Sequence, residues 1–236
     1  MEQERGKLSD RIKAFNCSLQ FDGFLPEDIR IMNPYKENPE ALKASSQFYD
    51  KFYYDNLPRY LLLGINPGRF GAGNTGVPFT DPKHLISHCG IDYAGKITHE
   101  PSSVFIYNMI DAFGGVYKFY KNFYIGAVSP LGFTKLKEGN KEVNYNYYDT
   151  PQIMSRVRGF IVENLYRQIE LGIHTNKVFC LGTGKNFKFL TDLNAEHKFF
   201  GMIIPLEHPR YIMQYRQQKT QEYTTKYIET FNNNII

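Results

Sequence analysis

The sequence lacks tryptophan, contains three cysteines, and has no hydrophobic run long enough to cross a membrane. A membrane-spanning helix needs roughly 20 consecutive apolar residues, whereas the apolar runs here, such as the segment 60–65, are far shorter. The cysteines are odd in number and far apart, which excludes a disulfide scaffold, and they are too few for an ordinary four-cysteine iron–sulfur cluster. The start of the chain is polar and carries no signal-peptide pattern. We therefore expect a reduced, soluble, intracellular protein.

Neither low complexity nor a strong charge of one sign is present. The 19 glycines and 12 prolines among 236 residues are close to ordinary globular usage, which excludes collagen-like and disordered chains. A net charge of +4 suits contact with phosphates, but many proteins without a nucleic-acid partner have a similar charge. The 18 tyrosines and 19 phenylalanines are numerous; such rings can stack on bases, although most pack in a core. The length favours one domain with a sizeable core.

Four short apolar segments predict strands that are buried on both faces. These segments are 60–65, 122–128, 178–181 and 199–204. Helical periodicity and capping signals before, between and after these segments predict helices at about 8–19, 39–52, 81–88, 101–113, 150–172, after 184, and at 211–231. The segments 21–37 and 135–149 are predicted to be loops. This alternation predicts an α/β fold with three α/β/α layers and a central four-stranded, mainly parallel sheet.

Four loops follow the carboxyl ends of these strands, where open parallel sheets bind their ligands. The loops begin at Asn66, Ser129, Gly182 and His208. We therefore expect the site at this edge of the sheet.

The loop after the first strand contains glycines, an asparagine and an aromatic ring. It lacks the lysine and serine or threonine that end an ATPase phosphate loop. Asn66 can hold a water molecule, Phe79 can stack on a flat ring, and the glycines let the backbone approach a ligand closely. The same residues also fit a tight structural loop with an asparagine cap and a core phenylalanine.

The other loops carry weaker signals. His208 follows the last strand directly, although a histidine before a proline often has a structural role. The segment Gly182, Thr183, Gly184 and Lys185 can bind a phosphate through backbone amides at a helix start, or it is an ordinary strand-to-helix turn.

Two patterns together resemble the single-strand-selective monofunctional uracil-DNA glycosylases, within the uracil-DNA glycosylase superfamily. The first is the ungapped series Asn-Pro-Gly at 66–68, Phe-Gly at 70–71 and Thr-Gly-Val-Pro-Phe at 75–79; the second is His208-Pro209. Weaker likeness includes Glu100-Pro101-Ser102, and the resemblance covers roughly residues 60–216. It implies the fold of that superfamily and a monofunctional DNA glycosylase of base excision repair. The resemblance also implies that the enzyme flips the damaged base out of the duplex, uses no metal or other cofactor and forms no Schiff base.

The resemblance also implies roles for individual residues. Asn66 would place the attacking water, and His208 would donate a hydrogen bond to the departing base. The residues expected to bind the base are Gly64, Ile65, Pro67, Gly68, Phe70, Gly71, Phe79 and Ser129. Those expected to contact DNA are Gly182, Thr183, Gly184, Lys185, Pro209, Arg210 and Tyr211.

Three departures from the family pattern concern recognition of the base and the phosphate. Arg69 stands where the family has proline, and Arg210 stands where it has a phosphate-binding serine. Ala127 occupies the place of the asparagine that reads the edge of uracil, so Ser129 or the backbone near Gly126 would take that role. We expect the base edge to be read loosely, with deaminated purines accepted beside uracil.

Two other functional classes remain open from the sequence. The chain could be a catalytically silent module that binds nucleic acids or nucleobases, or a hydrolase of free nucleosides. For the glycosylase interpretation we expect a monomer that acts on DNA in the cytoplasm, at the nucleoid if the organism is a bacterium, and that does not bind membranes. The predicted organisation is one domain, with an N-terminal helical extension at 1–57, an α/β core at 58–216 and a C-terminal helix at 217–236.

Overall fold

The computed structural model describes residues 6–235, so the polar start at 1–5 lies outside the described residues. A central sheet has the strand order β3-β2-β6-β7, and each neighbouring pair is parallel. The four strands are β2 (Tyr60–Gly64), β3 (Phe123–Ala127), β6 (Lys177–Leu181) and β7 (Met202–Leu206). The predicted fold class is therefore confirmed. All four predicted strands are present, although the fourth begins at Met202 and not at Phe199.

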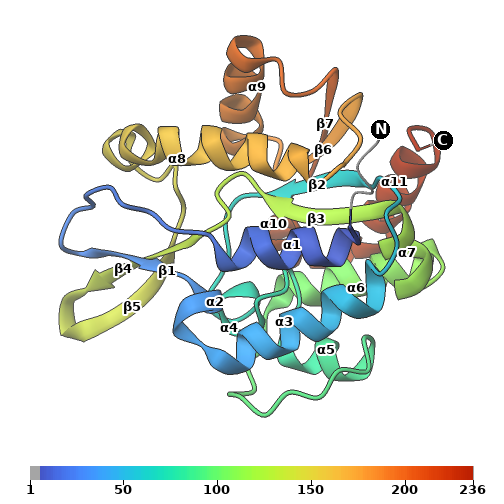
Figure 1. Ribbon diagram of the computed structural model, residues 1–236, viewed down its shortest axis with the longest axis horizontal. Coiled ribbons are helices and arrows are strands. Elements are labelled where there is room, and N and C mark those ends of the chain that lie inside the picture. Colours follow the sequence, from blue (N-terminus) through green and yellow to red (C-terminus); the bar gives the residue numbers. More distant parts are fainter. Residues whose placement is uncertain (1–5, 236) are drawn as a thin grey trace.

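Helices cover both faces of this sheet, which gives the three layers seen in Figure 1. The longer helices are α1 (Leu8–Cys17), α3 (Pro39–Phe52), α6 (Pro101–Phe113), α8 (Pro151–Glu170), α9 (Lys185–His197) and α11 (Thr220–Asn232). The shorter ones are α2 (Pro34–Glu37), α4 (Ala72–Thr75), α5 (Pro82–Ser87), α7 (Val116–Asn122) and α10 (Pro209–Tyr215), with 3₁₀ turns at Glu138–Asn140 and Gln217–Lys219. α8 and α9 lie on one side of the sheet and α6 on the other.

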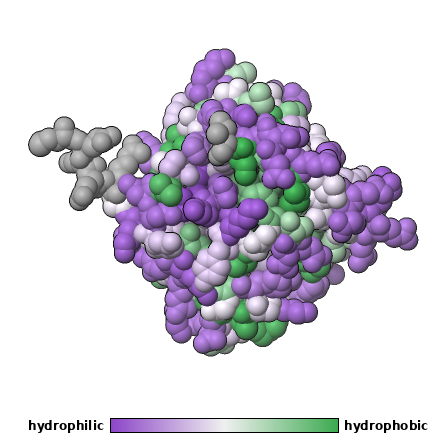
Figure 2. Space-filling model, turned by 90° about the vertical axis from the view of Figure 1, so that its right-hand side faces the viewer, coloured by the Kyte–Doolittle hydropathy of each residue, from purple (hydrophilic) through white to green (hydrophobic). Residues whose placement is uncertain are grey.

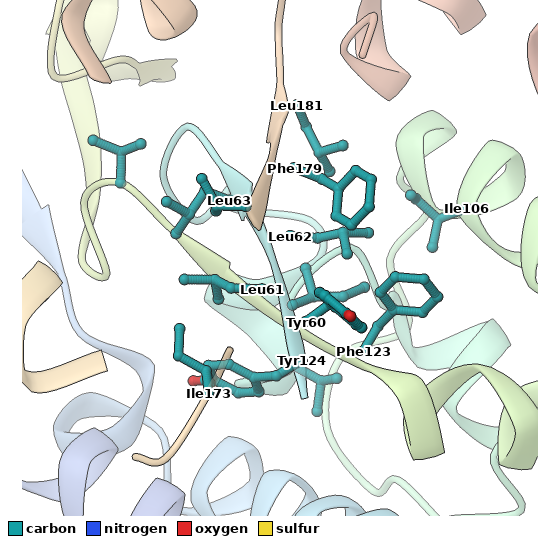
Figure 3. Close-up of a cluster of buried hydrophobic side chains, with 14 of the residues drawn as sticks. Tyr60, Leu61, Leu62, Leu63, Ile106, Phe123, Tyr124, Ile173, Phe179 and Leu181 are labelled. Atoms are coloured by element: carbon teal, nitrogen blue, oxygen red, sulfur yellow. The ribbon is translucent and has the colours of Figure 1, made fainter. Parts of the chain in front are cut away.

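Side chains of the central strands alternate between these two layers, as pleated strands require. In Figure 3, Leu62 and Phe123 point to the same side as Ile106 of α6, whereas Leu61 and Leu63 point to the opposite side. All five side chains are fully buried. Because both faces are covered, β2 reads as an uninterrupted apolar run in the sequence.

A second sheet was not expected from the sequence. It is antiparallel, with the order β1-β4-β5, and consists of β1 (Ile29–Met32), β4 (Gly132–Lys137) and β5 (Lys141–Tyr145). The prediction of loops at 21–37 and 135–149 is therefore wrong over these strands. Their charged, half-exposed residues do not form the apolar runs that mark the central sheet, and β1 finds its partner about a hundred residues along the chain.

Several helix boundaries follow the predicted capping residues. Asn38 Oδ1 accepts from the Glu40 and Ala41 amides at the start of α3, and Thr150 Oγ1 accepts from the Ile153 amide at the start of α8. Gly114, with φ of 113°, ends α6 in the left-handed region that favours glycine. The structure adds α7 directly after Gly115, a helix that the sequence did not indicate.

The N-terminal residues are joined to the core by side-chain hydrogen bonds, and they are not purely helical because β1 pairs with β4. The Tyr53 hydroxyl, just after α3, donates to the Phe123 carbonyl at 2.9 Å. Arg11 of α1 donates to the Leu171 carbonyl after α8 at 3.0 Å, and the Leu8 amide donates to the Asp55 carbonyl at 2.8 Å. In Figure 1, α1 lies in front of β3.

The side of the molecule in Figure 2 is mainly hydrophilic, with small hydrophobic patches between charged and polar residues. Over the described part of the chain, no helix combines the length and the hydropathy needed to cross a membrane.

Candidate active site

A cavity of about 250 Å³ opens at the carboxyl ends of β2 and β3. Its walls come from the loop after β2, the ends of β3 and β5, the first turn of α6, and α10. Segments far apart in the sequence therefore meet at the edge where a parallel sheet binds its ligand. Nine of the predicted site residues line this cavity: Gly64, Ile65, Asn66, Pro67, Gly68, Phe79, His208, Arg210 and Tyr211.

The Phe79 ring is fixed against the end of strand β2. A Cβ atom on Gly64 would lie 3.0 Å from Cε2 of this ring, so the close approach requires glycine at that position. Phe79 has a φ of 51°, an uncommon value for a residue with a side chain. Since local strain of this kind persists only where the surroundings enforce it, the loop holds the ring as a rigid wall of the cavity.

The Asn66 amide is held at both of its ends. Its oxygen accepts from the Tyr147 amide at 3.2 Å, and its nitrogen donates to the Tyr145 carbonyl at 3.2 Å. These bonds tie the loop after β2 to the segment that leaves β5. The amide oxygen has two lone pairs, so one acceptor position remains for a water molecule.

His208 stands at the start of α10, where its ring faces Phe79 with centroids 5.6 Å apart. Nδ1 accepts from the Arg210 amide at 3.1 Å. Burial and the positive charge of Arg210 lower the pKa of His208 to about 3. A neutral ring whose Nδ1 accepts a hydrogen bond carries its proton on Nε2. Within residues 6–235 no group hydrogen-bonds Nε2, so this N–H is available to a ligand.

Glu100 brings a carboxyl group to the same cavity. It is the residue before α6, and its amide donates to Asp81 Oδ2 at 2.9 Å. Burial raises the pKa of Glu100 to about 7, against the opposing attraction of Arg210. Negative Asp81 acts in the same direction as burial. The cavity thus combines an aromatic wall, a neutral imidazole donor, an amide and a carboxyl group that titrates near neutral pH.

Comparison with known proteins identifies the family. The model of the Uracil DNA glycosylase superfamily matches residues 51–232. This chain belongs to that superfamily. The chain is similar to the one in the crystal structure of wild-type Pedobacter heparinus SMUG2, with 54% sequence identity and a TM-score of 0.94. The match covers 96% of this chain and 97% of that chain. No curated protein matches significantly. The protein is thus a DNA glycosylase, an enzyme class that acts in base excision repair.

Some residues expected in the glycosylase site lie away from the cavity. Ser129 is fully buried, and its hydroxyl donates to the Leu131 carbonyl at 3.0 Å. The expectation that this hydroxyl reads the base edge is therefore corrected, because its proton is directed to the backbone. Phe70 is 43% exposed, with the Arg69 guanidinium 4.9 Å from its ring centroid. The cavity lining also leaves out Gly71, which packs behind it against Glu100.

The residues predicted to contact DNA fall into two groups. Arg210 and Tyr211 line the cavity, while Pro209 begins α10 as its buried first residue. Gly182, Thr183, Gly184 and Lys185 form a separate surface segment between β6 and α9. Thr183, Gly184 and Lys185 are exposed. Lys185 Nζ lies 6.0 Å from the ring centroid of Tyr148, which itself lines the cavity. This segment therefore lies next to the cavity without forming its wall.

Sequence reasoning missed Gln168, an amide of the glycosylase cavity that comes from α8. Its Nε2 donates to the Ala127 carbonyl at 3.1 Å and to the Asn164 carbonyl at 3.3 Å. A side chain at Gly126 would overlap Gln168 Oε1. The structure thus places the side-chain amide of Gln168 at the end of β3, with its oxygen beside Gly126 and its nitrogen on the Ala127 carbonyl. The available signal was a polar residue on the buried face of α8, where Asn164 is the other polar residue.

Proposed function

We propose that this protein is a monofunctional DNA glycosylase that hydrolyses the N-glycosidic bond of uracil and related damaged bases in DNA. The observation that carries the proposal is the pairing of the Phe79 ring with the free Nε2–H of neutral His208 in one cavity. A base is inaccessible inside a duplex, so the enzyme flips the nucleotide into the pocket. Phe79 then stacks on the base, and Gly64 allows the ring to lie against the strand end.

Charge develops in two places as the bond breaks. The base leaves with the bonding electron pair, and the sugar becomes an oxocarbenium-like cation. His208 donates its Nε2–H to the base oxygen where the negative charge appears. A neutral donor suits this task because it is already positioned before the reaction and needs no proton transfer.

Water attacks the anomeric carbon of the sugar. Asn66 orients this water through its remaining oxygen lone pair, which supplies geometry rather than basicity. Within residues 6–235, the cavity lining contains no lysine. We therefore expect direct hydrolysis without a Schiff base. As the resemblance to the glycosylase family implies, we also expect no metal ion or other cofactor in this reaction.

Recognition of the base is expected to be broad. The Ala127 side chain carries no amide, and the cavity is lined here by Gln168 and by the residues at the end of β3. Bases that share a ring N–H beside a carbonyl, which include uracil and the deaminated purines, meet the same donor and acceptor requirements.

The experiment is a release assay on oligonucleotides that carry uracil, 5-hydroxymethyluracil, hypoxanthine, xanthine or a thymine mismatch, in single strands and duplexes. Alkaline cleavage at abasic sites reports base release. We expect uracil excision that EDTA does not change, and no adduct trapped by borohydride. Loss of activity with EDTA that a divalent metal restores would overturn the cofactor-free mechanism, and a trapped adduct would indicate a lysine nucleophile.

Two other outcomes would replace the proposal. Binding to damaged DNA without base release would identify a silent binding module. Activity on free nucleosides with little dependence on salt would identify a nucleoside hydrolase, because DNA binding weakens steeply as salt rises.

A further inference from the structure

Glu100 is a carboxyl group of the cavity to which the mechanism above gives no task. It occupies the N-cap position of α6, but its side chain makes no capping hydrogen bond. The carboxyl group lies instead against the loop that follows Asn66. A Cβ atom on Gly68 would lie 3.0 Å from Glu100 Oε1, and one on Gly71 would overlap the carboxyl group. The two glycines therefore provide the space that this side chain fills.

Neighbouring residues fix the position of this carboxyl group. The Glu100 amide donates to Asp81 Oδ2, and the Ser103 hydroxyl donates to Glu100 Oε2 at 3.4 Å. Asp81 is itself fully buried and accepts from both the amide and the Nδ1 of His84. A glutamate held from both its backbone and its side chain, with its carboxyl group against a cavity, has the preorganisation that a catalytic group needs.

The charged groups around Glu100 come from three elements. Asp81 at the start of α5 disfavours ionisation, and Arg210 on α10 favours it. His99 precedes Glu100 in the chain, with its Nδ1 3.6 Å from Asp81 Oδ2. With a pKa raised to about 7 by burial, Glu100 can both accept and release a proton near neutral pH.

The attacking water must lose a proton, and Asn66 cannot accept one. An amide is neutral and very weakly basic, and in this structure its two ends are already bonded to Tyr147 and Tyr145. The Nδ1 of His208 is occupied by the Arg210 amide, while its Nε2 already carries a proton. Among the described residues that line the cavity, Glu100 alone carries a carboxylate that can take the proton.

We propose that the ionised carboxylate of Glu100 accepts the proton of the water that attacks the sugar. This proposal rests on the glycosylase function proposed above. The water oxygen forms a bond to the anomeric carbon, and the carbon–nitrogen bond breaks. Its electron pair leaves with the base, next to the Nε2–H of His208. The water proton passes to the Glu100 carboxylate and then to solvent or to the departed base.

The test is the single-turnover rate of uracil release, measured with saturating enzyme between pH 5 and pH 9. In the unmodified protein, the logarithm of the rate should rise with a slope of one up to a plateau above pH 7, because only the ionised carboxylate accepts a proton. Glu100→Gln should lower the plateau rate about 10²-fold, at the lower end of general-base effects. It should also remove the rise with pH, which loss of structure alone would not do.

Matched variants isolate the carboxyl group. Glu142→Gln changes a carboxylate that is paired with Arg69 and accepts from Thr134, outside the cavity lining, and it should keep the rate and the pH profile. His99→Asn should also keep the rise with pH, which excludes His99 as its source. Glu100→Asp retains a carboxylate that is one methylene shorter, and it should keep the rise with pH at a reduced plateau.

Thermal unfolding serves as the check on folding. Because the pKa of Glu100 is raised from 4.5 to about 7 in the folded state, the unfolded chain loses this proton first, and the fold loses stability as pH rises between these two values. Glu100→Gln should therefore be at least as stable as the unmodified protein at pH 8. If Glu100→Gln does not fold, the pH profile of Glu100→Asp decides in its place.

Two results would overturn the proposal in distinguishable ways. If the unmodified protein releases uracil and Glu100→Gln keeps its rate or the rise with pH, Glu100 is not the proton acceptor although the glycosylase function stands. If the unmodified protein releases no base from any substrate, the glycosylase function fails, and the role of Glu100 fails with it.

Discussion

The two polar residues of the cavity that the family motifs name, Asn66 and His208, are held in different ways. Asn66 directs both ends of its amide into the protein, where they fix the segment that follows β5. His208 uses one ring nitrogen to cap its own helix and leaves the other open to the cavity. Asn66 thus fixes the shape of the pocket as well as lining it, whereas His208 presents an N–H donor that no other group of the described residues hydrogen-bonds. Two residues named by motifs of one family can therefore differ in how much they contribute to stability and to rate.

The largest expected effect is on catalysis by His208. His208→Ala should slow uracil release about 10²- to 10³-fold, because one preorganised donor to the developing anion is lost. A base that carries negative charge more easily, such as 5-fluorouracil, needs this donor less and should partly restore the rate. Single-turnover kinetics on uracil and 5-fluorouracil DNA measure both effects.

His208→Asn is the matched control for the helix cap. Asparagine also accepts from the first amides of a helix, but it is too short to replace the Nε2–H. The His208→Asn variant should unfold at nearly the same temperature as the unmodified protein and still release uracil slowly. A rate loss that 5-fluorouracil relieves equally in Asn66 and His208 variants would show that the two residues do not differ as described.

The second effect combines rate and stability. Asn66→Ala should slow base release by misplacing water, with little rescue by 5-fluorouracil, while uracil-containing DNA still binds. It should also lower the free energy of unfolding by about 1–3 kcal/mol, because the Tyr147 N–H and the Tyr145 carbonyl lose their partners. Urea titration of Asn66→Ala beside His208→Asn measures the difference. Equal stability of the two would contradict the structural task assigned to Asn66.

A smaller effect concerns Gln168, whose side-chain nitrogen is bonded to the Ala127 and Asn164 carbonyls and which also lines the cavity. Gln168→Met should reduce uracil release by up to about 10-fold, the value of one net hydrogen bond. Adding Ala127→Asn should restore part of the rate by placing an amide at the end of β3. Unchanged release of every base in Gln168→Met would confine this residue to holding β3, as Asn66 holds β5.

The smallest effect lies on the DNA surface outside the cavity. Lys185→Ala should weaken DNA binding a few-fold and reduce the slope of log affinity against log salt by about 1, as expected for one phosphate contact. Lys188, on the same helix, is paired with Asp192 at 3.0 Å and is the matched control. Fluorescence anisotropy at several salt concentrations measures the slopes. An unchanged slope in Lys185→Ala would remove this segment from the DNA interface.

The sequence predicted the parts of the fold whose residues carry local signals. β2 is an apolar run, and α3 and α8 begin with capping residues followed by proline. The start of β7 was misplaced because Phe199 and Phe200 are buried by packing before the strand begins at Met202. An apolar run indicates that residues are buried, and it identifies a strand only where the buried residues also hydrogen-bond to a neighbouring strand.

The site was predictable where a motif names its residues. Asn66, Phe79 and His208 do line one cavity, but a motif does not reveal how many of their atoms are already bonded. Gln168 escaped because it has an ordinary position in its helix, and only tertiary packing brings it to the cavity. Glu100 belongs to a weak motif that gave it no role in the site, and packing at the start of α6 brings it to the cavity. Ser129 shows the opposite case. It follows β3 at the expected edge of the sheet, but its hydroxyl donates to the backbone of its own loop and not to the cavity.

The contacts along strand β3 have a further consequence. β3 is an edge of the central sheet, and such an edge can recruit a strand from another molecule and start aggregation. Here the Tyr53 hydroxyl occupies the Phe123 carbonyl at one end, and the Gln168 amide occupies the Ala127 carbonyl at the other. A foreign strand would have to displace both side chains before it could pair. The Gln168 amide thus borders the cavity and also occupies one hydrogen-bonding position on this edge of the sheet.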